Sequence, residues 1–142
     1  MNTAPQLVIA GIWRRLAALA YEAVLLFAML FVAGYLFVAI FGRSPAGLVR
    51  WIFFAYLVCV CGAYFVFCWV RSGQTLAQKT WGLKLTAADG SLLPTRRAAL
   101  RYLLALLSVG CVVGLLWALF DPERQFLHDR LAGSRIVLAN SA

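Results

Sequence analysis

Three long apolar runs dominate the chain, at about residues 16–41, 51–70 and 102–120. Each is close to the roughly 20 residues that an α-helix needs to cross a bilayer, because a helix rises about 1.5 Å per residue. None of them alternates between apolar and polar positions as a membrane β-strand does. The pattern therefore predicts an all-α membrane protein with three hydrophobic helices, built as a single domain over residues 1–142.

Tryptophan residues mark the ends of these runs. Trp13 precedes the first run, Trp51 and Trp69 bracket the second, and Trp117 lies near the end of the third. Indole rings prefer the headgroup level of a membrane, so this placement is typical of interfacial anchoring. A helix from Trp51 to Trp69 would rise about 27 Å, which is close to the thickness of the hydrocarbon layer.

Short strand-like segments in the polar intervals predict a small cytoplasmic β-hairpin between the second and third helices. Residues 83–86 and 91–93 flank Asp89-Gly90, a pair that favours a hairpin turn. Residues 136–138 look like a third short strand, and a third strand stabilises a marginal hairpin. If they join it, the tail over residues 121–142 lies on the hairpin's side and the third run is re-entrant. If that run crosses completely, the tail lies on the opposite side. Both arrangements stay open.

The composition excludes several classes of protein. Hydrophobic residues make up 64% of the chain and charged residues only 13%, with a mean hydropathy of +0.88. Soluble domains are usually about half apolar and about a quarter charged. So much apolar sequence cannot be hidden in one soluble core. A free soluble enzyme, a secreted disulfide scaffold and a disordered chain are therefore not expected.

Basic residues gather beside the apolar runs, and the net charge is +8. Arg14 and Arg15 precede the first run, whereas the loop over residues 71–101 holds six basic residues and only Asp89 as an acid. Cytoplasmic loops of membrane proteins collect Lys and Arg, so we expect the N-terminus and this loop on the cytoplasmic side, next to anionic lipid headgroups. Nucleic-acid binding is not expected, because the basic residues form no separate domain.

The chain holds few side chains suited to catalysis or to metal binding. Its four cysteines lie inside apolar runs without a Cys-x-x-Cys pair, and its one histidine is His128. Free cysteine in such sequence behaves as a small apolar residue. The sequence also lacks a pair of carboxylates spaced for acid–base chemistry and a glycine-rich phosphate loop. It therefore predicts no enzyme activity, no cofactor and no metal site.

Glu22 is the single charged residue of the first apolar run. An ionised carboxylate deep in a span costs about 2.5–3.5 kcal/mol on insertion scales, and such residues rarely face lipid. Two interpretations stay open: a structural contact that locks helices together, or a group that handles a ligand, an ion or a proton. Arg101, Tyr102 and Gln74 lie at a suitable depth to be its partner.

Arg15 lies two helical turns before Glu22, nearly on the same face. Helical side chains lean toward the N-terminus, so we expect Arg15 to reach away from Glu22, toward the headgroups. If the C-terminal tail lies on the same side of the membrane, Arg15 would be free to meet a carboxylate there. Asp129 is the obvious candidate.

Three motifs occur in order along the chain: residues 12–18 (IWRRLAA), 73–85 (GQTLAQKTWGLKL) and 127–133 (LHDRLAG). Together they resemble the RDD family of small bacterial membrane proteins, which is named for one arginine and two aspartates. Two positions depart from the family pattern. Glu22 stands where the first signature aspartate is expected, and Ala77 stands where a glycine is usual.

The resemblance implies a candidate ion or ligand site made of three signature residues, Arg15, Glu22 and Asp129. The candidate supporting residues are Arg14, Gln74, Arg101, Tyr102 and His128. The resemblance also implies a location in the bacterial cytoplasmic (inner) membrane. Transport of unknown ligands has been suggested for the family.

We therefore predict a small transporter or ion-coupled carrier with an intramembrane carboxylate. Three helices do not easily enclose a pathway, so transport would need a homo-oligomer or a larger membrane partner. The alternative is a non-transporting accessory or assembly subunit whose basic loop binds lipid or a protein partner. Glu22→Gln distinguishes the two hypotheses: it should abolish ion coupling in a carrier, whereas a packing contact should tolerate it.

Overall fold

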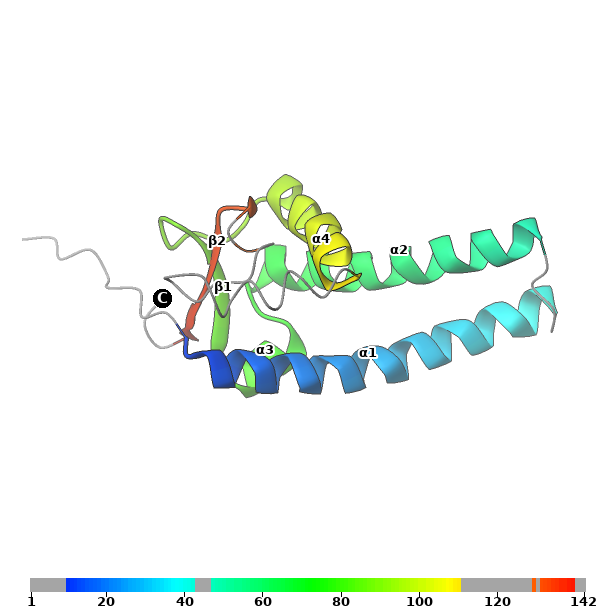
Figure 1. The fold of residues 1–142 in the computed structure, drawn as a ribbon, viewed down its shortest axis with the longest axis horizontal. Coiled ribbons are helices and arrows are strands. Elements are labelled where there is room, and N and C mark those ends of the chain that lie inside the picture. The colour runs from blue at the N-terminus through cyan, green and yellow to red at the C-terminus, as the bar shows by residue number, and fades with distance from the viewer. Residues whose placement is uncertain (1–9, 43–46, 111–128, 130, 140–142) are drawn as a thin grey trace, which may run out of the picture.

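The computed structural model describes residues 10–42, 47–110, 129 and 131–139, and the fold is given for these residues. In chain order they form α1 (Ile12–Phe41), α2 (Leu48–Arg71), α3 (Leu76–Thr80), β1 (Leu83–Ala87), α4 (Thr95–Gly110) and β2 (Ser134–Leu138) (Figure 1). The two long helices set the length of the molecule. The short elements α3, β1 and β2 gather at the end where α1 begins and α2 ends, which we call the sheet end.

Helices α1 and α2 lie side by side as an antiparallel pair (Figure 1). They cover the first two predicted spans to within one helical turn, and both are long and apolar enough to cross a membrane. Far from the sheet end, the ring centroid of Phe37 lies 5.0 Å from that of Phe53 and 5.5 Å from that of Tyr56. Many large apolar side chains of both helices are exposed, which is typical of helices that lie in a membrane.

Helix α4 covers the start of the third predicted span and packs against α2. The Tyr102 hydroxyl donates a hydrogen bond to the carbonyl oxygen of Val58, at 2.8 Å. A Cβ atom at Gly62 would lie 2.9 Å from the Tyr102 ring, so the absence of a side chain there permits the close approach. Residues 111–120 of the predicted span lie outside the described residues. Two helices of spanning length are present in the part of the chain that is described.

The two strands form an antiparallel sheet, with Leu83 opposite Leu138 and Ala87 opposite Ser134. The predicted hairpin is wrong, because β1 pairs with β2 and residues 91–93 form no strand. Asp89-Gly90 do turn the chain, and a single backbone bond runs from the N–H of Ala87 to the carbonyl of Ser91, at 2.9 Å. Pro94, which has no N–H, and helix α4 follow at once. Too few residues therefore remain between the turn and α4 to form a second strand that pairs with β1.

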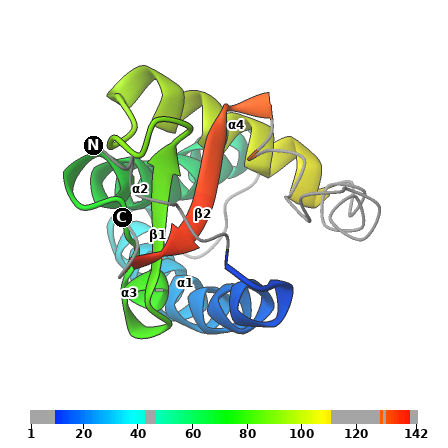
Figure 2. The same cartoon turned by 90° about the vertical axis from the view of Figure 1, so that its left-hand side faces the viewer.

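Strand β2 lies at the sheet end, next to the start of α1 (Figure 2). The N–H of Ala10 donates a hydrogen bond to the carbonyl oxygen of Ile136, at 3.2 Å. The predicted third strand is therefore confirmed as a strand, and it returns to the end at which α1 begins. Residues 111–128 lie outside the described residues, so the choice between a re-entrant third run and a complete crossing stays a prediction.

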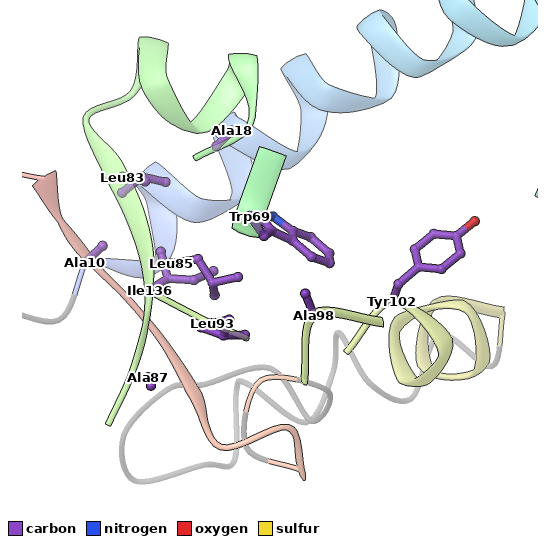
Figure 3. Close-up of a cluster of buried hydrophobic side chains, with 10 residues drawn as sticks. All are labelled: Ala10, Ala18, Trp69, Leu83, Leu85, Ala87, Leu93, Ala98, Tyr102 and Ile136. Carbon is purple, nitrogen blue, oxygen red and sulfur yellow. The ribbon is translucent and has the colours of Figure 1, made fainter. Parts of the chain in front are cut away.

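The hydrophobic core lies between the sheet and the helix ends (Figure 3). Its buried members include Trp69 from α2, Leu83 and Leu85 from β1, and Ile136 from β2. Gly73 has a φ of 69°, which lets the chain reverse after α2. The N–H of Leu85 donates a hydrogen bond to the carbonyl oxygen of Gly73, at 2.7 Å. A Cβ atom at Gly73 would lie 2.8 Å from the Leu85 carbonyl oxygen. This tight reversal carries α3 back onto α1, and β1 follows α3.

Candidate functional site: buried charges around an inter-helix cavity

One face of α1 carries two charged residues into the protein interior. Arg15, Ala18 and Glu22 follow the helical repeat, and their side chains are buried. Arg15 is 1% exposed and Glu22 is 6% exposed, whereas the neighbouring Arg14 is exposed. Arg15 therefore does not point outward to headgroups, and that prediction is wrong. Strand β2 and the α3 region cover this face, which the sequence pattern of α1 alone does not reveal.

A cavity of about 600 Å³ lies beside this face of α1 and is also lined by α2, α4 and the sheet end. Its wall is mostly apolar, and it carries a small set of polar side chains. These are Arg15, Glu22, Trp69, Thr75, Gln78, Arg101 and Tyr102. The wall therefore combines an apolar body with charged groups, which is the usual make-up of a binding site.

Glu22 is held by two hydroxyl groups. The Tyr64 hydroxyl donates a hydrogen bond to Glu22 Oε1 at 2.9 Å, and the Thr75 hydroxyl donates to Glu22 Oε2. Within the described residues Glu22 forms no ion pair. Its negative charge is therefore stabilised by neutral donors, without an opposite charge to neutralise it.

Thr75 and Tyr64 also hold the first turn of α3. Thr75 is the N-cap of this helix, and its hydroxyl oxygen accepts a hydrogen bond from the N–H of Gln78 at 3.2 Å. The Gln78 side chain accepts from the N–H of Thr75 at 3.0 Å, which completes a capping box. The Tyr64 hydroxyl accepts from the N–H of Leu76 at 3.4 Å. These bonds fix the start of α3 at Thr75.

A second buried cluster contains the other charged residues. Asp129 Oδ1 accepts hydrogen bonds from Arg101 Nε at 2.9 Å and from Nη2 at 2.5 Å, and both side chains are buried. The Arg101 guanidinium also lies 4.2 Å from the centroid of the Trp69 ring, in cation–π geometry. Arg15 donates from Nη2 to the carbonyl of Ile136 at 3.3 Å and is attracted electrostatically by Asp129. Arg15 and Asp129 therefore lie together, as the sequence suggested.

The partners proposed for Glu22 are wrong. The Gln74 amide donates to the carbonyl of Leu83 at 2.8 Å, Arg101 pairs with Asp129, and Tyr102 bonds to the backbone of α2. The reason is the tight chain reversal after α2, which brings Thr75 over α1 in place of Gln74. Of the other supporting residues, Arg14 is exposed and His128 lies outside the described residues.

Sequence reasoning missed Tyr64 and Thr75 as ligands of Glu22. The Thr75-to-Gln78 spacing is a readable capping-box signature, so the hydroxyl of Thr75 was a foreseeable helix cap. Nothing in the sequence distinguishes Tyr64 from the other aromatic residues of α2. Its role depends on the rotation of α2 against α1.

No group of three or more potential metal ligands among His, Cys, Asp and Glu occurs in the described part of the chain. Cys59, Cys61 and Cys68 are free thiols on α2. The polar groups around the cavity are thus carboxylates, guanidinium groups, hydroxyls and amides. They are suited to binding protons, cations or hydrogen-bonding ligands.

The sequence model of the RDD family matches residues 9–133, which is most of the chain. The chain belongs to the RDD family. This RDD protein is also 30% identical, over 84 residues, to the uncharacterized protein RP437 of Rickettsia prowazekii (strain Madrid E). That alignment covers 59% of this chain and 47% of the relative, so the chain spans about half the length of the curated relative. No solved structure matches it.

The three signature residues of this RDD protein divide between the two clusters. Arg15 and Asp129 belong to the cluster with Arg101, which we call the charged cluster. Glu22 forms the second cluster with Tyr64 and Thr75, which we call the hydroxyl cluster. Arg15 and Glu22 both line the cavity. Two of the three residues therefore line the cavity, and the three do not form a single hydrogen-bonded group.

Proposed function

We propose that this RDD protein is a small ion-coupled carrier of a bacterial cytoplasmic membrane, in which Glu22 takes up a proton or a cation. The observation that carries the proposal is the environment of Glu22. The carboxylate is buried in a helix of spanning length and is held by two hydroxyls. Intramembrane carboxylates are costly and often mark ion or proton paths.

The contrast with Asp129 supports this role for Glu22. Asp129 receives two hydrogen bonds from the Arg101 guanidinium, so its charge is compensated within the protein. Within the described residues Glu22 is bonded only to hydroxyls, so a mobile cation or a proton is the group that can compensate its charge. The adjacent cavity of about 600 Å³ provides room for such an ion with part of its water shell.

The carrier is proposed to act as a homo-oligomer or together with a larger membrane partner. Two helices of spanning length do not surround a pathway by themselves. Both helices expose large apolar side chains, such as Phe27 and Phe31 on α1 and Trp51 and Phe54 on α2. We propose that part of this exposed apolar surface contacts lipid and that another part contacts a second copy of the protein.

The proposed orientation places the N-terminus and residues 71–101 in the cytoplasm. It rests on the excess of basic residues at the sheet end. The exposed basic residues in this region are Arg14, Arg71, Lys79, Arg96 and Arg97. Cytoplasmic segments collect such residues.

The test is ion flux in proteoliposomes that contain the full-length protein and a pH-sensitive dye. A proton gradient with Na⁺ or K⁺ as the counter-ion should drive flux through the wild-type protein. Glu22→Gln should lower the rate about tenfold or more, at equal protein content, because an amide cannot bind a proton or attract a cation. Flux that survives in Glu22→Gln, or its absence for H⁺, Na⁺ and K⁺ in the wild type, would overturn the proposal.

Two matched variants control this experiment. Asp89→Asn also removes one acidic charge, but Asp89 is exposed in a turn, so flux should be unchanged. Glu22→Asp retains the charge with a shorter side chain and should keep part of the flux. A drop in Asp89→Asn equal to that in Glu22→Gln would indicate a general effect of surface charge.

A second candidate function is a non-transporting accessory or assembly subunit that binds anionic lipid or a protein partner. The observation that favours it is the exposed surface of α3 and its surroundings, where Leu76 and Trp81 are exposed next to Lys79. Such a combination of apolar and basic side chains suits a membrane surface. Under this alternative Glu22→Gln is tolerated, whereas the double variant Lys79→Glu, Arg97→Glu weakens binding to anionic vesicles.

A further inference from the structure

Two hydroxyl groups join Glu22 to the backbone of α3. The Tyr64 hydroxyl donates to Glu22 and accepts from the N–H of Leu76. The Thr75 hydroxyl donates to Glu22 and accepts from the N–H of Gln78. The first N–H groups of a helix have no partner inside the helix, so they depend on acceptors such as these. Each hydroxyl is thus shared between the carboxylate and one end of α3.

Counting protons shows that this arrangement needs an ionised carboxylate. A hydroxyl carries a single proton, and in both Tyr64 and Thr75 that proton points to Glu22. An ionised carboxylate accepts at both oxygens and satisfies both donors. A protonated Glu22 has an O–H on one oxygen, which then meets a hydroxyl proton. That hydroxyl then turns its proton away and accepts from the Glu22 O–H, while its second lone pair still accepts from the N–H group of α3. The bonds to an ionised carboxylate are charge-assisted and about twice as strong as the neutral bonds that replace them.

We propose that Tyr64 and Thr75 are positioning residues that couple the protonation state of Glu22 to the docking of α3 beside the cavity. The coupling rests on the proposed function, in which Glu22 is the ion-binding group. When Glu22 is ionised, both hydroxyls donate charge-assisted hydrogen bonds to it while they accept from α3. Protonation makes the bonds to Glu22 neutral and reverses one of them, so the first turn of the helix is held less strongly. Thr75 and Gln78 line the cavity, so this turn forms part of its wall.

Other ionisable groups face Glu22 from the surrounding elements. Arg15 lies on the same face of α1, and Cys68 of α2 is close enough to interact with it electrostatically. On α4, Arg101 and Tyr102 line the same cavity. Arg101 is bonded to Asp129 and Tyr102 to the backbone of α2. Glu22 is therefore the carboxylate that contacts both hydroxyls.

The test is backbone amide exchange of the full-length protein in lipid nanodiscs, followed by mass spectrometry of two peptides. The first peptide covers residues 75–82 and reports on α3. The second covers residues 83–90 and reports on β1, where the N–H of Leu85 bonds to Gly73. In Glu22→Gln, whose amide mimics the donor–acceptor pattern of the protonated acid, the α3 peptide should exchange about tenfold faster than in the wild type at the same pH. The β1 peptide should be unchanged.

Two variants separate coupling from simple loss of structure. Tyr64→Phe leaves Glu22 in place but removes the acceptor of the Leu76 N–H, so exchange in the α3 peptide should rise. Thr75→Ser keeps the hydroxyl and should match the wild type. Unchanged exchange in both Glu22→Gln and Tyr64→Phe overturns the proposal. Equal acceleration of both peptides also overturns it, because it indicates a merely structural role.

The outcomes distinguish this coupling from the carrier function. If Glu22→Gln abolishes flux while α3 exchange is unchanged, the carrier stands and the coupling is wrong. If α3 exchange responds to Glu22→Gln but the wild type moves no ion, the coupling stands and the carrier function is wrong.

Discussion

The charged cluster and the hydroxyl cluster lie at the same end of the molecule and differ in how the buried negative charge is stabilised. In the charged cluster, Asp129 is paired with Arg101, which also stacks on Trp69. In the hydroxyl cluster, Glu22 receives hydrogen bonds from Tyr64 and Thr75 and from no other described residue. The first arrangement has a full opposite charge in a fixed position, whereas the second has neutral dipoles that can rotate.

This difference assigns different roles to the two carboxylates. A buried ion pair is expensive to break, because the remaining partner is left as an uncompensated charge. A carboxylate held by hydroxyls can gain a proton at the cost of reorienting one O–H group. We therefore expect the charged cluster to hold the sheet end together and the hydroxyl cluster to respond to ions. The predictions below test this division, from the largest expected effect to the smallest.

Asp129→Ala should cause the largest loss of stability. It leaves the Arg101 guanidinium buried without its carboxylate, which costs about 3–5 kcal/mol for a buried pair. Thermal unfolding in detergent measures the loss, and Asp89→Ala serves as the exposed control. The double variant Arg101→Met, Asp129→Leu should recover part of the stability, since it removes both charges. A single-variant loss close to that of Asp89→Ala would show that the pair is not structural.

A buried and an exposed arginine stand at adjacent positions, so the loss of stability should be larger in Arg15→Ala than in Arg14→Ala. Arg15 donates to the carbonyl of Ile136 and is attracted by Asp129, so its loss should cost about 1.5–3 kcal/mol. Arg14 is exposed, and its replacement should change stability by at most about 0.5 kcal/mol. Unfolding midpoints of the two variants give the comparison. Equal midpoints would mean that the buried contacts of Arg15 do not contribute to the stability of the protein.

Tyr64→Phe should have a smaller effect on stability, of about 1–2 kcal/mol, because it removes one hydrogen bond to a carboxylate. Tyr56→Phe is the matched control on the same helix, since within the described residues its ring packs on Phe37 and its hydroxyl has no hydrogen bond. If the hydroxyl cluster were as structural as the charged cluster, Tyr64→Phe would destabilise the protein as much as Asp129→Ala.

The turn at Asp89 should show the smallest effect and a dependence on pH. The hydroxyl and N–H of Ser91 bond to Asp89 Oδ1, at 2.7 and 3.0 Å, and hold the pKa of this carboxyl below its ordinary value near 3.8. Its contribution to stability is present above pH 4 or so and is lost as the pH falls through the folded pKa. The difference in unfolding midpoint between wild type and Asp89→Ala should therefore vanish in acid. A difference that persists at low pH would contradict this.

The sequence predicted the two long helices well because their signals are local. The apolar runs located α1 and α2 to within a turn. The strand at residues 136–138 was also found. The pairing of the strands was not predicted correctly. The turn at Asp89-Gly90 suggested residues 91–93 as the partner of β1, whereas β1 pairs with β2. A partner far along the chain leaves no local signal.

For the candidate site, the sequence alone determined which charges are too costly to leave facing lipid. It marked Glu22 within an apolar run and, through the family motifs, Arg15 and Asp129. Only the tertiary structure decided which groups compensate them. Tyr64 and Thr75 are 42 and 53 residues from Glu22 along the chain, and Ile136 is 121 residues from Arg15. Their contacts depend on the reversal at Gly73 and on the return of β2 to the start of α1, and these arise only when distant segments pack together.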